Sequence, residues 1–148
     1  MSKVMANRLR TLLQHVISES HGAFIPGRCI QDNVLVSFEV IHYLKRKRQG
    51  VMGFMALKLD MSKAYDRAEW SYLIAIMTRL GFSPEWNELV SCFMRTLTYS
   101  VSLGGRETSR FAPSRGIRQG DPFSPYLFLL CMEGLSHLLQ KAQGAGWH

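Results

Sequence analysis

An apolar run that ends abruptly in a carboxylate is the feature that most constrains how this chain can fold. The run covers residues 51–59 and is followed directly by Asp60. Its length and its large apolar side chains predict a buried or half-buried strand. Because side chains at a strand end lie at the rim of a sheet, Asp60 would stay solvated and still face a cleft, which makes it a candidate metal ligand or base. The competing interpretation is that Asp60 or Ser62 caps the helix that follows.

Helical periodicity accounts for most of the remaining chain. Apolar side chains at a spacing of three to four residues predict five helices, over residues 3–17, 32–47, 70–80, 86–97 and 126–140. Asp32 is expected to cap the start of the second helix, and Gly81 is expected to end the third. Ser124 is expected to cap the fifth, with a proline in its first turn.

A hairpin is predicted between the fourth and fifth helices. Residues 99–103 alternate between apolar and polar side chains, and the Gly104-Gly105 pair that follows is a strong turn signal. The returning strand is expected to run to about Phe111. Residues 114–125 contain too much glycine and proline for regular structure, and too much Arg, Gln and Asp for a simple linker. The predicted fold class is α+β, with helices packed on a small antiparallel sheet.

The charge, the cysteines and histidines, and the hydropathy of the chain limit the classes of protein to which it can belong. The chain has 148 residues and a net charge of +7, and its first 50 residues carry eight basic but only three acidic side chains. This first third is therefore expected to face a polyanion, although the basic run 45–48 would also complement a helix dipole. Three widely separated cysteines predict no disulfide framework and an intracellular protein. No histidine or cysteine spacing fits a zinc site, and no stretch is apolar enough to span a membrane.

Two separated motifs can now be read together. KLDMSKAYDRAEW, at 58–70, and RGIRQGDPFSPYLF, at 115–128, resemble the first palm motif and the following RQGDP motif of reverse transcriptases of non-LTR (LINE-like) retrotransposons, most closely those of plants. HGAFIPGRCIQDN, at 21–33, and LLCMEGLS, at 129–136, are similar to the same family in the same order. The resemblance covers nearly the whole chain, and the RQGDPxSP block is highly specific.

The resemblance implies RNA- and DNA-templated DNA synthesis on a right-hand polymerase fold. It assigns Asp60 as the first carboxylate for Mg²⁺, the ion that clamps the attacking and leaving oxygens in such enzymes. It assigns Tyr65 as the aromatic gate beneath the incoming sugar, although the ring could instead pack under a palm helix. Gln119 and Gly120 would line the pocket for the dNTP and the template, and Arg28, in the fingers, would meet template or triphosphate. The implied partners are an RNA template, a DNA primer and a dNTP.

Two further acidic residues of these motifs have structural interpretations. Asp66 is expected to act as a cap or as an ion-pair partner of Arg67 or Lys63. Asp121 either lies at the nucleotide pocket with its neighbours or pairs with Arg118 to hold the loop together.

The sequence also departs from the family pattern. It contains no Asp-Asp pair, and the family's aromatic-Ala-Asp-Asp motif would lie beyond His148. We therefore expect a truncated domain, with a fingers-like part at 1–50 and a partial palm at 51–148, that is inactive alone. The alternatives are a non-catalytic, basic nucleic-acid-binding remnant and an inert product of a decayed element. An uncovered palm face would favour self-association.

Overall fold

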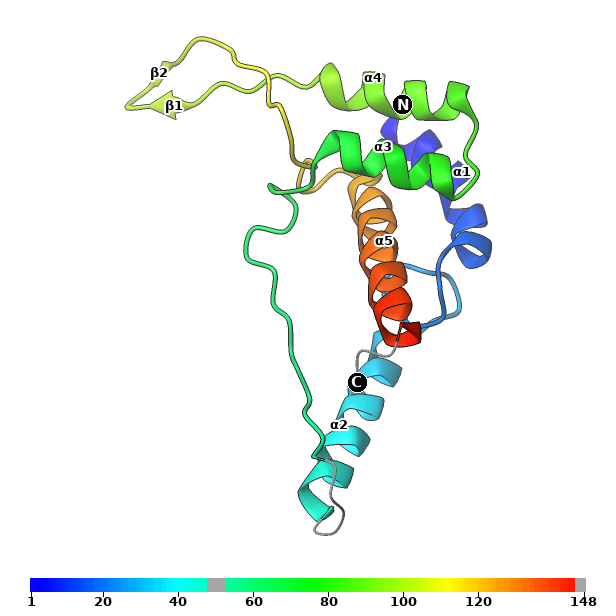
Figure 1. Ribbon diagram of the computed structural model, residues 1–148. Helices are drawn as coiled ribbons and strands as arrows, with labels where there is room; N and C mark the ends of the chain where they lie inside the picture. Colours follow the sequence, from blue (N-terminus) through cyan, green and yellow to red (C-terminus); the bar gives the residue numbers. More distant parts are fainter. Residues whose placement is uncertain (48–52, 146–148) are drawn as a thin grey trace.

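Five helices and one short hairpin are present in the computed structural model, which describes residues 1–47 and 53–145 (Figure 1). The helices are α1 (Ser2–Val16), α2 (Ile30–Arg46), α3 (Trp70–Arg79), α4 (Pro84–Arg95) and α5 (Ser124–Gly144). The strands are β1 (Ser102–Leu103) and β2 (Arg106–Glu107). All five predicted helices and the predicted hairpin are therefore confirmed. Within the described residues, no helix is long and apolar enough to cross a membrane.

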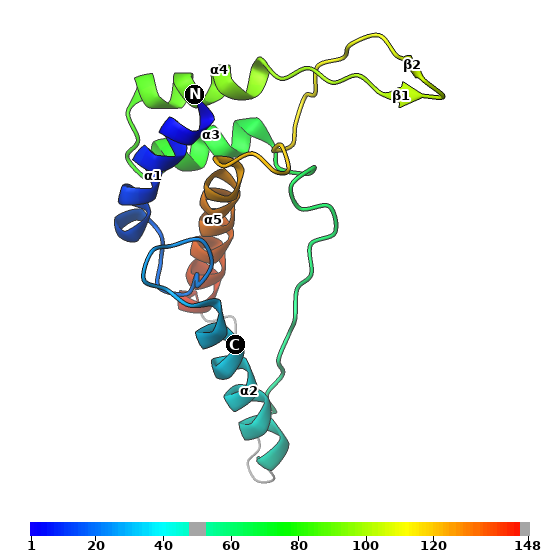
Figure 2. The same cartoon turned by 180° about the vertical axis from the view of Figure 1, so that it is seen from behind.

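The core lies where α1, α3 and α4 gather around the first half of α5. Helix α3 packs on both α4 and α5, and α1 packs on α5; Figures 1 and 2 show this cluster from opposite sides. Each of these four helices contributes fully buried apolar side chains to it, among them Leu9, Leu73, Val90, Leu127 and Leu130. The predicted periodicity is what makes this packing possible, since it places these side chains on one face of each helix.

Helices α3 and α4 are joined by a tight connection that the sequence predicts correctly. Gly81 has a φ of +87°, and the N–H of Phe82 donates to the Met77 carbonyl at 3.1 Å. A residue in this left-handed conformation ends a helix, and glycine adopts it without steric cost. Ser83 then accepts a hydrogen bond from the N–H of Trp86, which satisfies a free donor at the start of α4.

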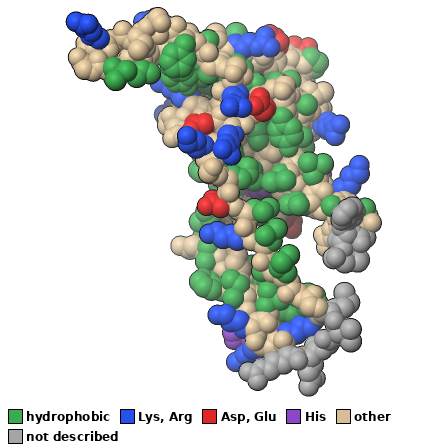
Figure 3. All heavy atoms as spheres, turned by 60° about the vertical axis from the view of Figure 1, so that its left-hand side comes forward, with side chains coloured by type: hydrophobic (Ala, Val, Ile, Leu, Met, Phe, Trp, Pro, Cys, Tyr) green, Lys and Arg blue, Asp and Glu red, His purple; other side chains and the backbone are tan. Residues whose placement is uncertain are grey.

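Helix α2 extends away from the other helices and has no buried residue. Its predicted apolar face is exposed: Val34, Phe38 and Ile41 keep 44–66% of their surface, and Figure 3 shows apolar side chains along this part of the surface. The helix begins at Ile30, two residues before the expected start, so the prediction that Asp32 caps it was wrong. The apolar periodicity predicted the helix correctly. Whether its apolar face is buried depends on which other segments pack on it.

The predicted strand before Asp60 is not formed over residues 53–59; residues 51 and 52 lie outside the described part. The segment is extended but has no paired neighbour, and Phe54, Leu57 and Leu59 are each more than half exposed. A strand needs a partner to satisfy its backbone groups, and the described chain supplies none beside this segment. A side-chain contact of this segment is the one with Lys47, whose Nζ atom lies 3.4 Å from the centroid of the Phe54 ring.

The hairpin is small and stands apart from the core. Ser102 pairs with Glu107 and Leu103 with Arg106, around the two glycines of the predicted turn. All four strand residues are exposed, and in the described chain neither strand packs on a helix. The expectation that helices pack on the antiparallel sheet was therefore wrong, because the helices bury their apolar faces against one another. The mixture of helices and a small antiparallel sheet is compatible with the predicted α+β class.

Candidate functional site

Backbone hydrogen bonds hold the two family-like motifs against each other. The N–H of Ile117 donates to the Tyr65 carbonyl at 2.8 Å, and the N–H of Gly116 donates to the Ala68 carbonyl at 2.8 Å. The indole N–H of Trp70 donates back to the Gly116 carbonyl at 2.7 Å. These three bonds join segments about 50 residues apart in the sequence, so that the turn at 62–67 and the loop at 115–121 form one unit.

Gly116 is at the point of closest approach between these segments. Its φ is +92°, and a Cβ atom there would lie 3.1 Å from the carbonyl oxygen of Asp66. Any other residue would be strained by the conformation and crowded by the backbone. A glycine is therefore required for the loop to reach the turn.

The unit borders an open cavity of about 470 Å³, at which three of the predicted site residues lie together. Its lining consists of Tyr65, Gln119, Gly120, Asp121, Ser124 and Pro125. The first of these comes from one motif and the other five from the second. The structure therefore places Tyr65 beside Gln119 and Gly120.

The Tyr65 ring is held in place by an aromatic neighbour. It stacks on Phe128 of α5, with ring centroids 4.9 Å apart and an angle of 18° between the planes. Burial raises the pKa of the Tyr65 phenol above its ordinary value, so the hydroxyl remains neutral and able to donate a hydrogen bond. The ring therefore packs against α5, as one of its two interpretations expected, and it also lines the cavity.

The acidic side chains of the two motifs follow the expectations only in part, since Asp121 lines the cavity beside Gln119 and Gly120 but neither acidic side chain forms the expected ion pair. The Oδ1 atom of Asp121 accepts hydrogen bonds from the Phe123 N–H, at 2.9 Å, and from the Ser2 hydroxyl. Asp121 thus ties the start of α5 to α1 and does not pair with Arg118. Asp66 forms no ion pair within the described residues, so its expected pairing with Arg67 or Lys63 was also wrong.

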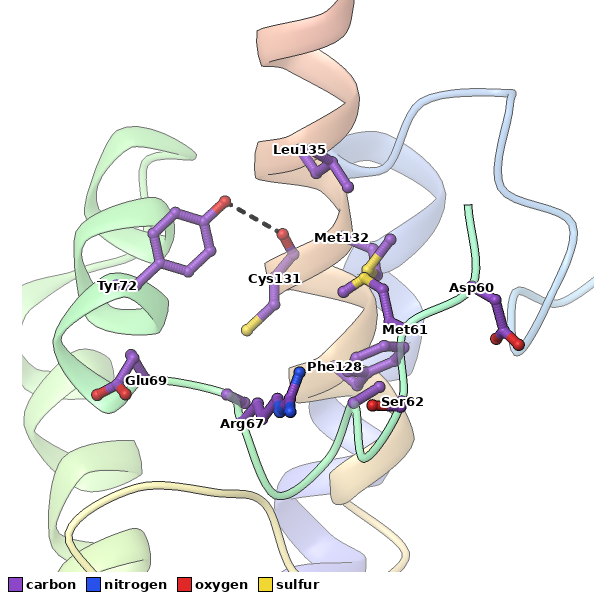
Figure 4. Close-up of a pocket in the computed structure, with 12 residues that line it drawn as sticks. Asp60, Met61, Ser62, Arg67, Glu69, Tyr72, Phe128, Cys131, Met132 and Leu135 are labelled. Atoms are coloured by element: carbon purple, nitrogen blue, oxygen red, sulfur yellow. Dashed lines mark hydrogen bonds between the residues drawn. The ribbon is translucent and has the colours of Figure 1, made fainter. Parts of the chain in front are cut away.

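Asp60 lies at a separate cavity of about 630 Å³, between the segment 60–72 and α5 (Figure 4). Its side chain is exposed, and Figure 4 shows the carboxylate pointing away from Cys131 and Arg67. Burial raises the pKa of the Cys131 thiol to about 12, so this thiol stays protonated and is neither a ligand nor a nucleophile at neutral pH.

The donor set around Asp60 does not complete a metal site. Among the described residues, no group of three or more His, Cys, Asp or Glu side chains could hold a metal ion. The other acidic group of this cavity, Glu69, is paired with Arg115 at 3.3 Å. Divalent ions of the Mg²⁺ type need several hard oxygen ligands, so the residues present do not fit a two-ion centre by themselves.

Arg28 is not brought to either cavity. Its guanidinium donates to the carbonyls of Ile17, Ser18 and His21, at 3.2, 2.5 and 3.0 Å. These contacts use its donors to close the end of α1 and the following turn. The structure therefore places Arg28 in an internal role and not beside Tyr65 and Gln119.

A buried polar cluster around Glu133 was missed by the sequence analysis. Glu133 is 1% exposed, and its carboxylate accepts hydrogen bonds from the N–H and hydroxyl of Ser18, both at 3.0 Å. The Nε2 atom of His21 lies 3.2 Å from Oε2 of Glu133, and the Nδ1 atom of His137 lies 3.2 Å from Oε1 of Glu133. Desolvation is the main cause of the lowered pKa of His21. The available signal was a lone acidic residue within the apolar helix 126–140.

Comparison with known proteins agrees with the motifs. The family described as "Reverse transcriptase (RNA-dependent DNA polymerase)" matches residues 1–146. The transposon TX1 uncharacterized 149 kDa protein of Xenopus laevis is 31% identical over 140 residues, which are 95% of this chain and 10% of that protein. The Pol polyprotein of the type-1 retrotransposable element R2 of Popillia japonica is 26% identical over 145 residues, 97% of this chain and 20% of the polyprotein.

A third relative is also similar to this chain over nearly its whole length. The Pol polyprotein of the type-2 retrotransposable element R2DM of Drosophila melanogaster is 26% identical over 146 residues, 98% of this chain and 13% of the polyprotein. This chain therefore spans only about a tenth to a fifth of the length of these relatives. Since the family match covers nearly all 148 residues and its two motifs meet at one cavity, the chain belongs to the reverse transcriptase family.

Proposed function

We propose that this chain forms the nucleotide-binding part of a reverse transcriptase active site of the non-LTR retrotransposon type. The observation that carries the proposal is the cavity of about 470 Å³ in which Tyr65, Gln119 and Gly120 lie together. Its ligand would be the incoming dNTP, and the RNA template and DNA primer would be the macromolecular partners.

The chemistry of the lining suits a nucleotide. The Tyr65 ring presents a rigid apolar surface for the sugar, and a ribose 2′-hydroxyl would have to occupy the space that this ring fills. Gln119 supplies donors and an acceptor without adding charge. Gly120 has a φ of +83°, and no atom lies within 4 Å of where its Cβ would be, so ligand can approach the backbone closely.

The proposed gate can be tested on the protein alone. We expect ¹⁵N NMR titration to show that dATP binds more tightly than ATP, with shifts at the Gln119 and Gly120 amides. In Tyr65→Ala the preference for dATP should fall roughly tenfold, or about 1.4 kcal/mol, because the obstacle to the 2′-hydroxyl is removed. Tyr99→Ala, in the distant hairpin, is the matched control and should leave the preference unchanged. Equal binding of dATP and ATP to the wild-type chain would contradict the proposal.

We propose Asp60 as one carboxylate ligand of the catalytic Mg²⁺. Because no second acidic group completes the shell in the described residues, the 148-residue chain should not extend a primer by itself. The measurement is primer extension on a homopolymer RNA template with Mg²⁺, with a complete reverse transcriptase as positive control. Incorporation by the wild-type chain that disappears in Asp60→Ala would show that the shell is completed in another way and would overturn this expectation.

A further inference from the structure

We propose that Trp70 is a positioning residue for the nucleotide pocket, because its indole N–H holds the Gly116 carbonyl and so sets where Gln119 and Gly120 lie relative to Tyr65. This inference rests on the proposed function, since it concerns the same pocket. Trp70 itself does not line the cavity. It would therefore act on the ligand only through the loop.

Trp70 is anchored to the buried core of the molecule. It is the first residue of α3, and the next turns of this helix contribute Leu73 and Met77, both with no exposed surface, to the core. The Trp70 side chain is itself partly buried against this core. A donor fixed in this way holds its acceptor at a defined distance from the helix bundle.

The loop that carries Gln119 and Gly120 has little structure of its own. Residues 115–120 form no helix or strand, so their position depends on the contacts that the loop makes with other segments. At its start, these include the two backbone bonds to Tyr65 and Ala68, the burial of Ile117, which is 5% exposed, and the indole bond of 2.7 Å. The loop also has an ion pair between Arg115 and Glu69, but both of these side chains are more than half exposed. The indole bond is the partly buried contact that a single side-chain substitution removes without altering the backbone of either segment.

A second tryptophan provides a matched control. Trp86 of α4 is also partly buried against the core, where its ring meets Phe123 edge-on, with centroids 6.5 Å apart. Its indole N–H has no hydrogen-bond partner in the described part of the chain. Replacing Trp86 with phenylalanine therefore removes similar aromatic surface but breaks no hydrogen bond.

The test compares Trp70→Phe with Trp86→Phe by ¹⁵N NMR on the full 148-residue chain. Without nucleotide, Trp70→Phe should speed amide exchange at Gly116 and Ile117 by about fivefold, as expected for the loss of one hydrogen bond, whereas Trp86→Phe should not. With nucleotide, Trp70→Phe should weaken dATP binding several-fold and reduce the ratio of dATP to ATP affinity. Trp86→Phe should change neither quantity.

The outcomes separate this inference from the proposed function. If the wild-type chain binds no dATP, the proposed function fails, and the exchange experiment still tests the indole contact. If the wild-type chain binds dATP but Trp70→Phe keeps both the affinity ratio and the exchange rates, the positioning role is overturned. Equal changes in both tryptophan variants would show a general packing effect and would also overturn it. Gly116→Ala disturbs the same contact from the loop side, so it should reproduce the faster exchange at Ile117.

Discussion

Replacing Phe123 with alanine should lower the free energy of unfolding by about 3–5 kcal/mol, the range for deleting a buried aromatic side chain. Phe123 immediately precedes α5 and has no exposed surface. Its ring meets Phe93 and Trp86 edge-on, with centroids 5.6 and 6.5 Å away. The substitution would leave a cavity where α4 packs against the start of α5. Urea unfolding followed by far-UV circular dichroism is the measurement.

Phe111→Ala is the matched control for this prediction. Phe111 is 51% exposed and contacts Tyr99 in the hairpin, at 6.1 Å between centroids. Its removal should cost less than about 1 kcal/mol, since little buried surface is lost. Similar losses for the two variants would mean that the core does not depend on Phe123 as described.

Replacing Glu133 with alanine should lower the free energy of unfolding by about 3 kcal/mol, because its removal leaves buried polar groups without a partner. The N–H of Ser18 would lose its acceptor, and His21, whose imidazole is partly buried, would lose its carboxylate neighbour. The segment after α1 would then be held to α5 mainly by the hydrogen bond between His21 and Ser136, at 3.0 Å. Thermal and urea unfolding would measure the loss.

Two further variants test whether the loss of stability comes from the buried hydrogen bonds of Glu133. Glu133→Gln keeps an acceptor for Ser18 and should lose less stability than Glu133→Ala. Glu69→Ala removes a carboxylate whose ion pair with Arg115 is more than half exposed on both sides. It should cost no more than about 1 kcal/mol, as exposed pairs contribute little. A Glu133→Ala chain as stable as Glu69→Ala would show that the buried cluster does not stabilise the fold.

The helices were predictable because their signals are local. Periodic apolar residues identified all five, and Gly81 and Ser83 mark the connection between α3 and α4 through conformations and caps that nearby residues decide. The hairpin was predictable for the same reason, since the Gly104-Gly105 turn determines it.

The strand before Asp60 was not predictable because a strand is not a local structure. The apolar run at 53–59 is extended, as its composition suggests, but pairing requires a neighbour that the described residues do not provide. Asp60 consequently lies on an exposed segment and not at a sheet edge. The same distinction applies to α2, whose apolar face was inferred correctly as a pattern but is not covered.

The sequence by itself determined the family, the helices and the hairpin, because motifs, periodicity and turn signals are properties of short stretches. Only the tertiary structure decided what individual polar side chains do. Arg28 is bound to three carbonyls, Asp121 accepts hydrogen bonds from Ser2 and from the N–H of Phe123, and Glu133 is buried among partners from distant segments. The physical reason is that a charged group takes the partners that folding brings within hydrogen-bond distance, and sequence spacing does not specify those partners.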